Sequence, residues 1–408
     1  MSGHVATIKW ICPSSRLHTY TWSSSPRFGT SNEFVVNHKV ILALATSGQL
    51  PIQYKRFSQT CGYGHLSEKV RKDSHEMLRE CIGEQYEESI EVAMENEHEL
   101  TEEATEEGII VMSNARHGWR KNAKDTSVVV IGDQSSQVLA HEHITKGDDP
   151  ISQRHEALGT LRIMDRFQEK EVNVKMWVHD RNMTINKAVK DRGLKNQNDL
   201  WHGIKKLKNE LKKVTEGPKK THNVNWQTEL DDKLIAVSKH AHWATIDSHG
   251  DVQALTSKLD TIIPHYKNNH LNCIPTSRCR TDPHYQSSCN QITDPIAEQL
   301  LHKALASSLI YKNPADFCYG KDIQYVESFN NVLNIFQDKR IAFSDKEYLS
   351  QSHLAVLHWN QNVNRECTSE WRKPSAANRR GKVKKNYKKV TYQYRKNLWE
   401  RFKMKLLN

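Results

Sequence analysis

The sequence predicts an α/β fold, with a mixed sheet interrupted by a large all-helical insertion and preceded by a small, mostly helical N-terminal module. Three observations predict it. Short runs rich in β-branched residues crowd between residues 108 and 145, as the strands of one sheet do. A helix-spaced segment at 155–170 separates them from another alternating run at 173–180. From Trp201 to Pro314 the apolar residues recur at helical spacing.

The first 107 residues divide at a change in charge. Residues 1–79 mix short apolar runs with Ser, Pro and Gly, and they include the helical run VNHKVILALATSG, which ends at Gly48. Residues 80–107 contain twelve Glu and no Lys or Arg, and a weak apolar face predicts one acidic helix followed by a linker. The charge of this helix suits either a solvated surface or contact with the basic C-terminal tail of the same chain.

The predicted core occupies residues 108–202 and 315–370. GIIVMSN, TSVVVIGD and QVLAHEHIT read as three strands of a meander, HEALGTLRIMDRFQEK as a helix, NVKMWVHD as a fourth strand and MTINKAVKD as a helix. This succession is what a ribonuclease H-like sheet would show. The insertion at 203–314 includes the Lys-rich segment GIKKLKNELKKV, and two later helices, around YVESFNNVLNIF and YLSQSHLAVLHWNQNV, return to the sheet.

The net charge of +11 is concentrated in the basic tail, residues 371–408. From Arg372 onward there are 14 Lys or Arg and one acid, Glu400. DNA is a suitable partner because neutralised phosphates release counterions, although a solvated tail is the alternative. A second basic group follows the first strand, and a solvated positive rim is the alternative there. The residues expected to contact DNA phosphates are Arg116, Arg120, Lys121, Lys124, Arg379, Arg380, Lys384 and Lys385.

Other features exclude whole classes of protein. No apolar run approaches the roughly 20 residues that a membrane span needs, and the first residues lack the order of a signal peptide. Eight Cys in 408 residues are too few for a disulfide scaffold. We therefore expect an intracellular protein without a membrane partner.

The stretch WVHDRN ends a predicted strand on Asp180, which places a carboxylate at the carboxyl edge of the sheet, where α/β folds bind ligands. Two divalent metals about 4 Å apart can run phosphoryl transfer on a nucleic acid, and Mg²⁺ prefers a few oxygen ligands. Glu327 is the expected further carboxylate, although a solvated Glu is the alternative, and the first strand offers Asn114. Asp125 and Asp133 border the second strand, where neither is well placed to substitute.

Several motifs together resemble the transposase of eukaryotic cut-and-paste DNA transposons, most closely the Kolobok-like group. They are GIIVMSNARHGWRKNAKDTSVVVIG, WVHDRNMTINKAVKD, NDLWHGIKKLKNELKK, HYKNNHLNC, YVESFNNVLNIFQDKRIAF and HLAVLHWNQNVNRE. The resemblance runs from about His18 to the end of the chain. It implies a ribonuclease H-like DDE core with a helical insertion, and Mg²⁺-dependent cleavage of transposon ends followed by strand transfer to target DNA.

The resemblance also implies roles for single residues. Asp180 matches the second acid and Glu327 the third, while Asp199 and His202 match the family's acid-x-x-His signature. Asn114 stands where the first Asp is expected. An amide oxygen can bind Mg²⁺ but brings no charge, so we expect metal affinity and rate to fall by orders of magnitude. Without the resemblance, His202 is equally well explained as a hydrogen-bonded core residue.

The segment HYKNNHLNCIPTSRC predicts a separate metal site within the insertion. His265, His270, Cys273 and Cys279 have residue types and intervals that suit a structural Zn²⁺ site, with His284 as a reserve ligand. The alternative is a set of scattered polar residues and core thiols.

Three functions remain open from the sequence. The first is a nuclear, homo-oligomeric DDE transposase with impaired catalysis, and the second is a non-enzymatic DNA-binding or chromatin protein that kept the fold. The third is an active nuclease that uses Asp180, Glu327 and a rescuing acid.

Overall fold

The computed structural model describes residues 3–29, 33–104, 108–118, 122–217, 225–372 and 383–407. Four residues expected to contact DNA, Arg120, Lys121, Arg379 and Arg380, therefore lie outside the described residues. The chain divides into two compact units. Unit 1 comprises residues 1–107, 115–163 and 325–408, and unit 2 comprises residues 108–114 and 164–324.

A five-stranded mixed sheet confirms the predicted α/β class, and the boundary between the units passes through its strand β3. The strand order is β5-β4-β3-β6-β7. Strands β4 and β5 are antiparallel, whereas β3 is parallel to β6 and β6 is parallel to β7. Their bounds are β3 (Ile109–His117), β4 (Asp125–Gly132), β5 (Val138–Thr145), β6 (Val174–His179) and β7 (Lys195–Asn198).

Strand β4 shows why these segments form the sheet. All its residues are buried, and its β-branched run TSVVVIG suits a strand that is covered on both faces. Helix α4 (His155–Glu169) packs closely on this strand at Gly159, where a Cβ atom would lie 2.6 Å from Val128 Cγ2. The helix can approach the strand this closely because glycine has no side chain.

Strand β7 is the one strand of this sheet that the sequence analysis did not predict. Its sequence, KNQN, contains no apolar residue, yet Asn196, Gln197 and Asn198 are buried. The Gln197 amide is paired on both sides inside unit 2: its Nε2 donates to Ala315 O at 2.7 Å, and its Oε1 accepts from Tyr319 N at 3.1 Å. Helix α5 (Met183–Asp191) connects β6 to β7.

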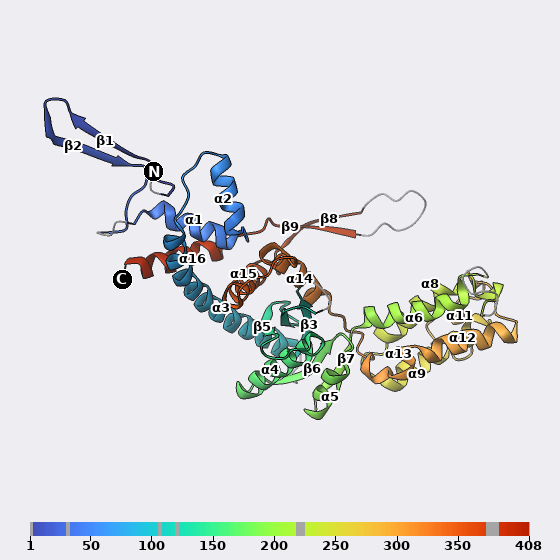
Figure 1. The fold of residues 1–408 in the computed structure, drawn as a ribbon. Helices are drawn as coiled ribbons and strands as arrows, with labels where there is room; N and C mark the ends of the chain where they lie inside the picture. The colour runs from blue at the N-terminus through green and yellow to red at the C-terminus, as the bar shows by residue number, and fades with distance from the viewer. Residues whose placement is uncertain are drawn as a thin grey trace. The chain divides into compact units, whose positions relative to one another are not determined.

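The insertion is helical, as predicted, and has its own apolar core. In helix α6 the buried residues include Ile204, Leu207, Leu211 and Val214, at helical spacing, while the lysines face outward. Helices α8 and α12 pack against α6 (Figure 1). The elements are α6 (Leu200–Thr215), α8 (Lys233–Ile246), α9 (Val252–Asp260), α10 (Ile262–Tyr266), α11 (Arg278–Thr281), α12 (Pro295–Ser307) and α13 (Leu309–Lys312).

In unit 1 the acidic segment is part of one long helix. Helix α3 spans Glu68–Ala104, so it begins earlier than the expected residue 80. Helices α15 and α16 pack along it (Figure 1). The other helices of this region are α1 (Val35–Thr46), α2 (Pro51–Thr60), α14 (Gln324–Phe336), α15 (Asp345–Asn362) and α16 (Gln393–Leu407).

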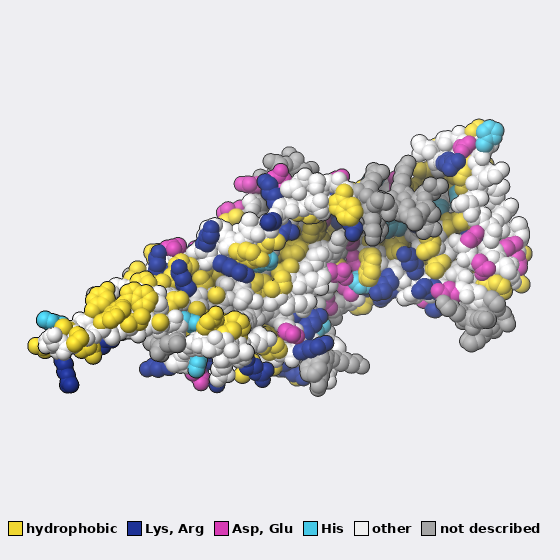
Figure 2. Space-filling model, turned by 90° about the horizontal axis from the view of Figure 1, so that it is seen from above, with side chains coloured by type: hydrophobic (Ala, Val, Ile, Leu, Met, Phe, Trp, Pro, Cys, Tyr) yellow, Lys and Arg dark blue, Asp and Glu magenta, His cyan; other side chains and the backbone are white. Residues whose placement is uncertain are grey.

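The N-terminal module also contains a β-hairpin that the sequence analysis did not predict. Strands β1 (Thr7–Cys12) and β2 (Ser15–Ser23) are antiparallel, and hydrophobic side chains gather on this hairpin at the left of Figure 2. Its exposed large hydrophobic residues are Ile8, Trp10, Ile11, Leu17, Tyr20 and Trp22. In the described residues no helix is long and apolar enough to cross a membrane.

Candidate functional site

Asp180 lies where the sequence predicted it, directly after strand β6. Its side chain is 43% exposed, and its Oδ1 accepts a hydrogen bond from Arg181 N at 2.8 Å. The Asn182 side chain then caps helix α5 by accepting from Thr184 N at 3.1 Å. The preceding residue, His179, is buried and bonded to Asn196 Oδ1 at 3.0 Å, and burial lowers its pKa. The turn from strand to helix therefore holds a half-exposed carboxylate directly after a buried, hydrogen-bonded histidine.

Asp199 and His202 lie together beside Asp180. Asp199 is the N-cap of helix α6, and its Oδ2 accepts from His202 N at 2.8 Å and bonds His202 Nδ1 at 2.5 Å. Its Oδ1 accepts from Ile323 N at 3.1 Å. His202 Nδ1 is 3.9 Å from Asp180 Oδ1. Unit 2 therefore brings Asp180, Asp199 and His202 together, and both oxygens of buried Asp199 have protein donors.

The predicted magnesium ligands fall in different units. Asn114 is half-buried in β3, and the parallel register pairs Ser113 with His179, so Asn114 and Asp180 are the next residues of adjacent strands in unit 2. Glu327 is exposed in the first turn of helix α14 and belongs to unit 1. A magnesium site formed by these three residues stays a prediction.

Asp125, which we expected to be poorly placed to replace the first acid, is buried at the start of β4. Its Oδ1 is 3.0 Å from His143 Nε2 and 3.7 Å from Lys124 Nζ. The His143 ring stacks on Tyr348 with centroids 4.2 Å apart. Asp125 is therefore already paired within unit 1. Asp133 lies in the turn after β4, where its Oδ2 accepts from Gln134 Nε2 at 3.2 Å.

Arg116 corrects one expectation about DNA contacts. It is 3% exposed, and Nη2 donates to Asn334 Oδ1 at 2.8 Å and to Gln337 O at 2.6 Å. Gln337 in turn donates to Tyr348 O at 2.6 Å. The guanidinium, which has five donors in a fixed plane, joins β3 to the C-terminal helices of unit 1. Arg116 therefore acts inside the fold and not at a DNA-facing rim.

Three other predicted DNA-contacting lysines are exposed. Lys124 is 51% exposed and is paired with Asp345 at 2.5 Å. Lys384 and Lys385 lie on strand β9 (Val383–Tyr387), which forms a hairpin with β8 (Cys367–Arg372). Lys385 Nζ is 3.3 Å from Glu370 Oε1, and Lys384 Nζ is 5.4 Å from the centre of the Trp371 ring. Both lysines of this exposed hairpin therefore point no further than its own strands, and phosphate contacts stay a prediction.

The last part of the basic tail is instead bound to the acidic helix of the same chain. In helix α16, Tyr394, Leu398 and Phe402 are buried. Arg401 pairs with Glu88 at 2.7 Å and with Glu84 at 3.2 Å, while Lys405 pairs with Glu84 at 2.8 Å and with Glu80 at 3.0 Å. The hydrogen bond from Lys405 lowers the pKa of the Glu84 carboxyl. Of the two expectations for the acidic helix, contact with the tail is the one observed.

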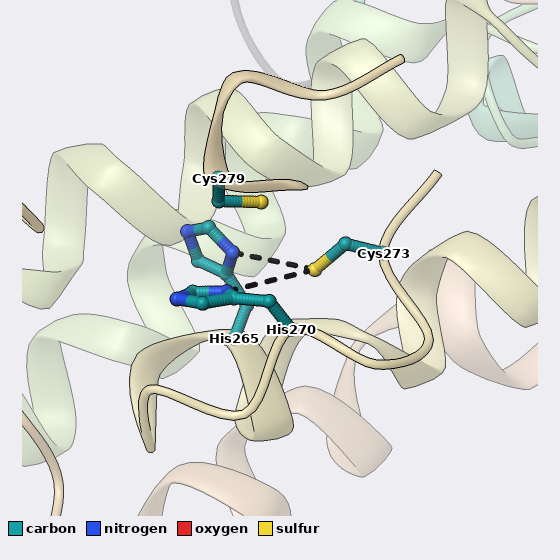
Figure 3. A group of neighbouring side chains, drawn as sticks. All are labelled: His265, His270, Cys273 and Cys279. Carbon is teal, nitrogen blue, oxygen red and sulfur yellow. Dashed lines mark hydrogen bonds between the residues drawn. The ribbon is translucent and has the colours of Figure 1, made fainter. Parts of the chain in front are cut away.

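The four predicted zinc ligands gather in the insertion (Figure 3). His265 comes from α10, His270 and Cys273 from the following loop, and Cys279 from α11. One ligand atom from each residue lies within 4.8 Å of all the others. Among the described residues this is the group of His, Cys, Asp or Glu that could hold a metal ion. His284, the reserve ligand, is not part of it.

Within this group the Cys273 sulfur faces a ring nitrogen of each histidine. Cys273 Sγ is 3.5 Å from His265 Nδ1 and 3.8 Å from His270 Nδ1 (Figure 3). Burial raises the pKa of the Cys273 thiol to about 11, with a further contribution from the Cys279 hydrogen bond. A coordinating divalent cation reverses such a preference for the neutral thiol, because it binds the thiolate.

Sequence reasoning missed one charged residue that supports this loop. Lys233 is fully buried, and its Nζ donates to Asn290 O at 2.6 Å, to Glu229 O at 3.0 Å and to Asp232 Oδ1 at 2.5 Å. A single Lys at the start of a helix carries no sequence signal for burial, because lysine is almost always exposed. Two of its partners, Glu229 and Asp232, are local, and only Asn290 comes from a distant part of the chain, 57 residues further on.

No protein-family model matches the chain, and no curated protein matches it either. The transposase family, its activity and its DNA partner therefore stay predictions from the motifs quoted above.

Proposed function

We propose that this chain is a transposon-derived DNA transposase of the DDE type, acting in the nucleus as a homo-oligomer and with impaired catalysis. The observation that carries the proposal is the register of β3 and β6. Because Ser113 lies opposite His179, Asn114 within β3 and Asp180 directly after β6 take neighbouring positions on two adjacent parallel strands. Asp180 lies at the carboxyl edge, where open α/β sheets bind ligands. The meander, helix and parallel fourth strand also follow the succession expected for a ribonuclease H-like core.

The donor types at this edge suit Mg²⁺, which prefers oxygen ligands. When bound, Mg²⁺ would activate the attacking oxygen and neutralise the leaving one in DNA strand cleavage and transfer. Asp180 would supply one carboxylate and Glu327 another. Asn114 would supply a neutral amide oxygen, so the set carries one negative charge fewer than three acids. That missing charge is the physical reason to expect weak metal binding and slow cleavage.

DNA binding is proposed for the hairpin of β8 and β9 and for Lys124. Their amines are exposed. Lys385 is held by one surface ion pair and Lys384 by one ring contact, whereas Lys124 is paired with Asp345 and also lies 3.7 Å from Asp125. A phosphate can replace exposed contacts of this kind at little cost. Helix α16 is not included, because Arg401 and Lys405 are each held by two glutamates of α3.

The second candidate is a non-enzymatic DNA-binding or chromatin protein that kept this fold. Two observations favour it. Asn114 replaces the expected acid. Both carboxylate oxygens of Asp199 are engaged in hydrogen bonds, one with His202 and one with Ile323 N, as in a helix cap. In this alternative the acid-x-x-His signature is retained for stability alone.

A cleavage assay separates the candidates. Full-length wild type, Asn114→Asp, and Asn114→Asp combined with Asp180→Asn are incubated with an end-labelled DNA fragment that carries the sequences flanking the gene, in Mg²⁺ or Mn²⁺. We expect background cleavage by the wild type, at least tenfold more by Asn114→Asp, and background again in the double variant.

Each other outcome assigns a different function. Cleavage by the wild type that Asp180→Asn abolishes would identify an active nuclease with a rescuing acid. Salt-sensitive DNA binding without cleavage by any variant would identify the non-enzymatic protein. If the wild type neither binds nor cleaves the fragment or an unrelated duplex, the DNA-directed function is wrong.

A further inference from the structure

The segment between helices α10 and α12 is unusually long for a connection inside a compact helical unit. It runs from Lys267 to Asp294, and its one helix is the four-residue α11. Loops of this length with little secondary structure are uncommon in compact domains unless something other than backbone pairing holds them. Its two ends are fixed, because Ile292 N donates to Tyr266 O at 2.9 Å and the buried Lys233 donates to Asn290 O at 2.6 Å. The middle of the loop is where the His and Cys side chains gather.

The spacing of the ligand atoms fits a tetrahedron around one ion. With Zn–S of about 2.3 Å and Zn–N of about 2.0 Å, the sulfur and nitrogen of a tetrahedral site lie roughly 3.6 Å apart. The distances from Cys273 Sγ to Nδ1 of His265 and of His270 are 3.5 Å and 3.8 Å. Cys279 Sγ completes the set within 4.8 Å of the other ligand atoms (Figure 3). An ion at the centre therefore needs only small side-chain movements.

Hydrogen bonds around the cluster point its donor atoms inward. Nε2 of His270 is 3.1 Å from Asn268 Oδ1, which can only accept, so Nε2 carries the proton and Nδ1 presents a lone pair to the cluster. Arg280, one residue after Cys279, donates to the backbone carbonyls of Leu271 and Cys273. The loop is thereby folded back so that Cys273 and Cys279 face the two histidines.

We infer that His265, His270, Cys273 and Cys279 bind one Zn²⁺ ion in a closed structural site that holds this loop of the insertion together. Two thiolates and two imidazoles in a tetrahedral set select zinc over Mg²⁺ and Ca²⁺, which take oxygen ligands. Four protein ligands leave no open position for water or substrate, so the ion has a structural role. The inference does not depend on the proposed DNA chemistry.

An ion can reach the site from solvent. His265, Cys273 and Cys279 form part of the lining of an open pocket of about 590 Å³, whose other walls include Trp243 and Lys258. A disulfide between Cys273 and Cys279 is the competing use of the same thiols, and both are free in this structure. The two uses differ in metal content and in mass, so they are separable by experiment.

The test measures zinc in the full-length chain, purified without added metal, by mass spectrometry of the metal and of the intact protein. We expect about one zinc per chain in the wild type and in Cys289→Ser, and none in Cys273→Ser. Cys289 is the control because it lies in the same loop, is partly buried like Cys279, and is not part of the cluster. Replacing zinc with Co²⁺ should give the absorption bands of tetrahedral, thiolate-bound cobalt.

Cys273→Ser can fail to fold, so the wild type alone also provides a test. Chelation should remove the zinc and make two more thiols reactive toward an alkylating reagent, and added Zn²⁺ should protect both again. Wild-type protein that is folded and reduced but does not bind Zn²⁺ or Co²⁺ overturns the inference. So does an intact mass two hydrogens below the reduced value with no zinc, which indicates the disulfide.

Discussion

Unit 2 contains two clusters of titratable side chains that differ in how far protein hydrogen bonds satisfy their polar atoms. The first is Asp180, Asp199 and His202, next to β6 and at the start of α6, where regular elements hold each residue. The second is His265, His270, Cys273 and Cys279, which lies mainly on a loop (Figure 3). Both bring ligand-type atoms within a few ångströms, so proximity alone does not identify a metal site.

The hydrogen bonds of the two clusters explain the difference. In the first cluster Asp199 has protein donors on both oxygens, and Asp180 Oδ1 accepts from Arg181 N. In the second, Cys273 Sγ faces two imidazole nitrogens, and thiol sulfur is a weak donor and a weak acceptor. The carboxylate cluster is therefore stable without an ion, whereas the thiol cluster gains most from one.

Removing zinc should have the largest effect on stability. At a free zinc concentration a thousand times the dissociation constant, binding stabilises the folded chain by about 4 kcal/mol. We expect chelation to lower the free energy of unfolding of the insertion by roughly that amount. Urea unfolding followed by far-UV circular dichroism, with and without chelator, measures it.

Cys289→Ser should show the same loss on chelation, because its sulfur is not a ligand. Cys273→Ser should be destabilised already and should no longer respond to the chelator. Superimposable unfolding curves for wild type with and without chelator would show that the second cluster, like the first, does not depend on a metal ion for stability.

Asp199→Ala should have the next largest effect. The change removes a helix cap and the buried acceptor for His202 and Ile323 N, which together should cost about 2 kcal/mol. Asp180→Ala is the matched control, because that carboxylate is 43% exposed and its loss should cost no more than about 0.5 kcal/mol. Urea unfolding of both variants measures the difference. Equal costs would mean that Asp199 has no special structural role.

The sequence predicted the apolar parts of this fold better than the polar ones. The β-branched runs of β3, β4 and β5 and the amphipathic α6 have clear periodicity, and the structure confirms them. Strand β7 has no apolar residue, and the buried Gln197 amide that helps to hold it has partners more than a hundred residues away. The gathering of the His and Cys residues was predictable, since the ligands lie within 15 residues of sequence.

The predicted carboxylate site shows that residue spacing does not predict long-range hydrogen bonds. Asp199 accepts a hydrogen bond from Ile323 N, 124 residues further along the chain, and the local sequence DLWH does not predict that contact. Arg116 likewise finds its partners Asn334 and Gln337 in a distant helical segment. Long-range hydrogen bonds of this kind decide whether a charged side chain serves folding or function, and local patterns do not encode them.

Asn114→Asp should give the smallest of these effects and is the most direct way to change the first cluster. The new carboxylate would lie on β3 at the position next to Asp180 on the adjacent strand, so repulsion between like charges should lower stability by about 0.5 kcal/mol without metal. Added Mg²⁺ should offset this loss, because at roughly five times its dissociation constant it raises the free energy of unfolding by about 1 kcal/mol. The wild type should respond to Mg²⁺ much less, because its edge carries one charge fewer.

Thermal unfolding in a Mg²⁺ titration, with zinc held constant, measures the difference between the two proteins. The Asn114→Asp variant combined with Asp180→Asn serves as the control, since it has the same net charge as the wild type and should lose the response. An equal response of wild type and Asn114→Asp to Mg²⁺ would show that the ion binds elsewhere. In that case the missing acid at Asn114 would not account for the impaired catalysis that we propose.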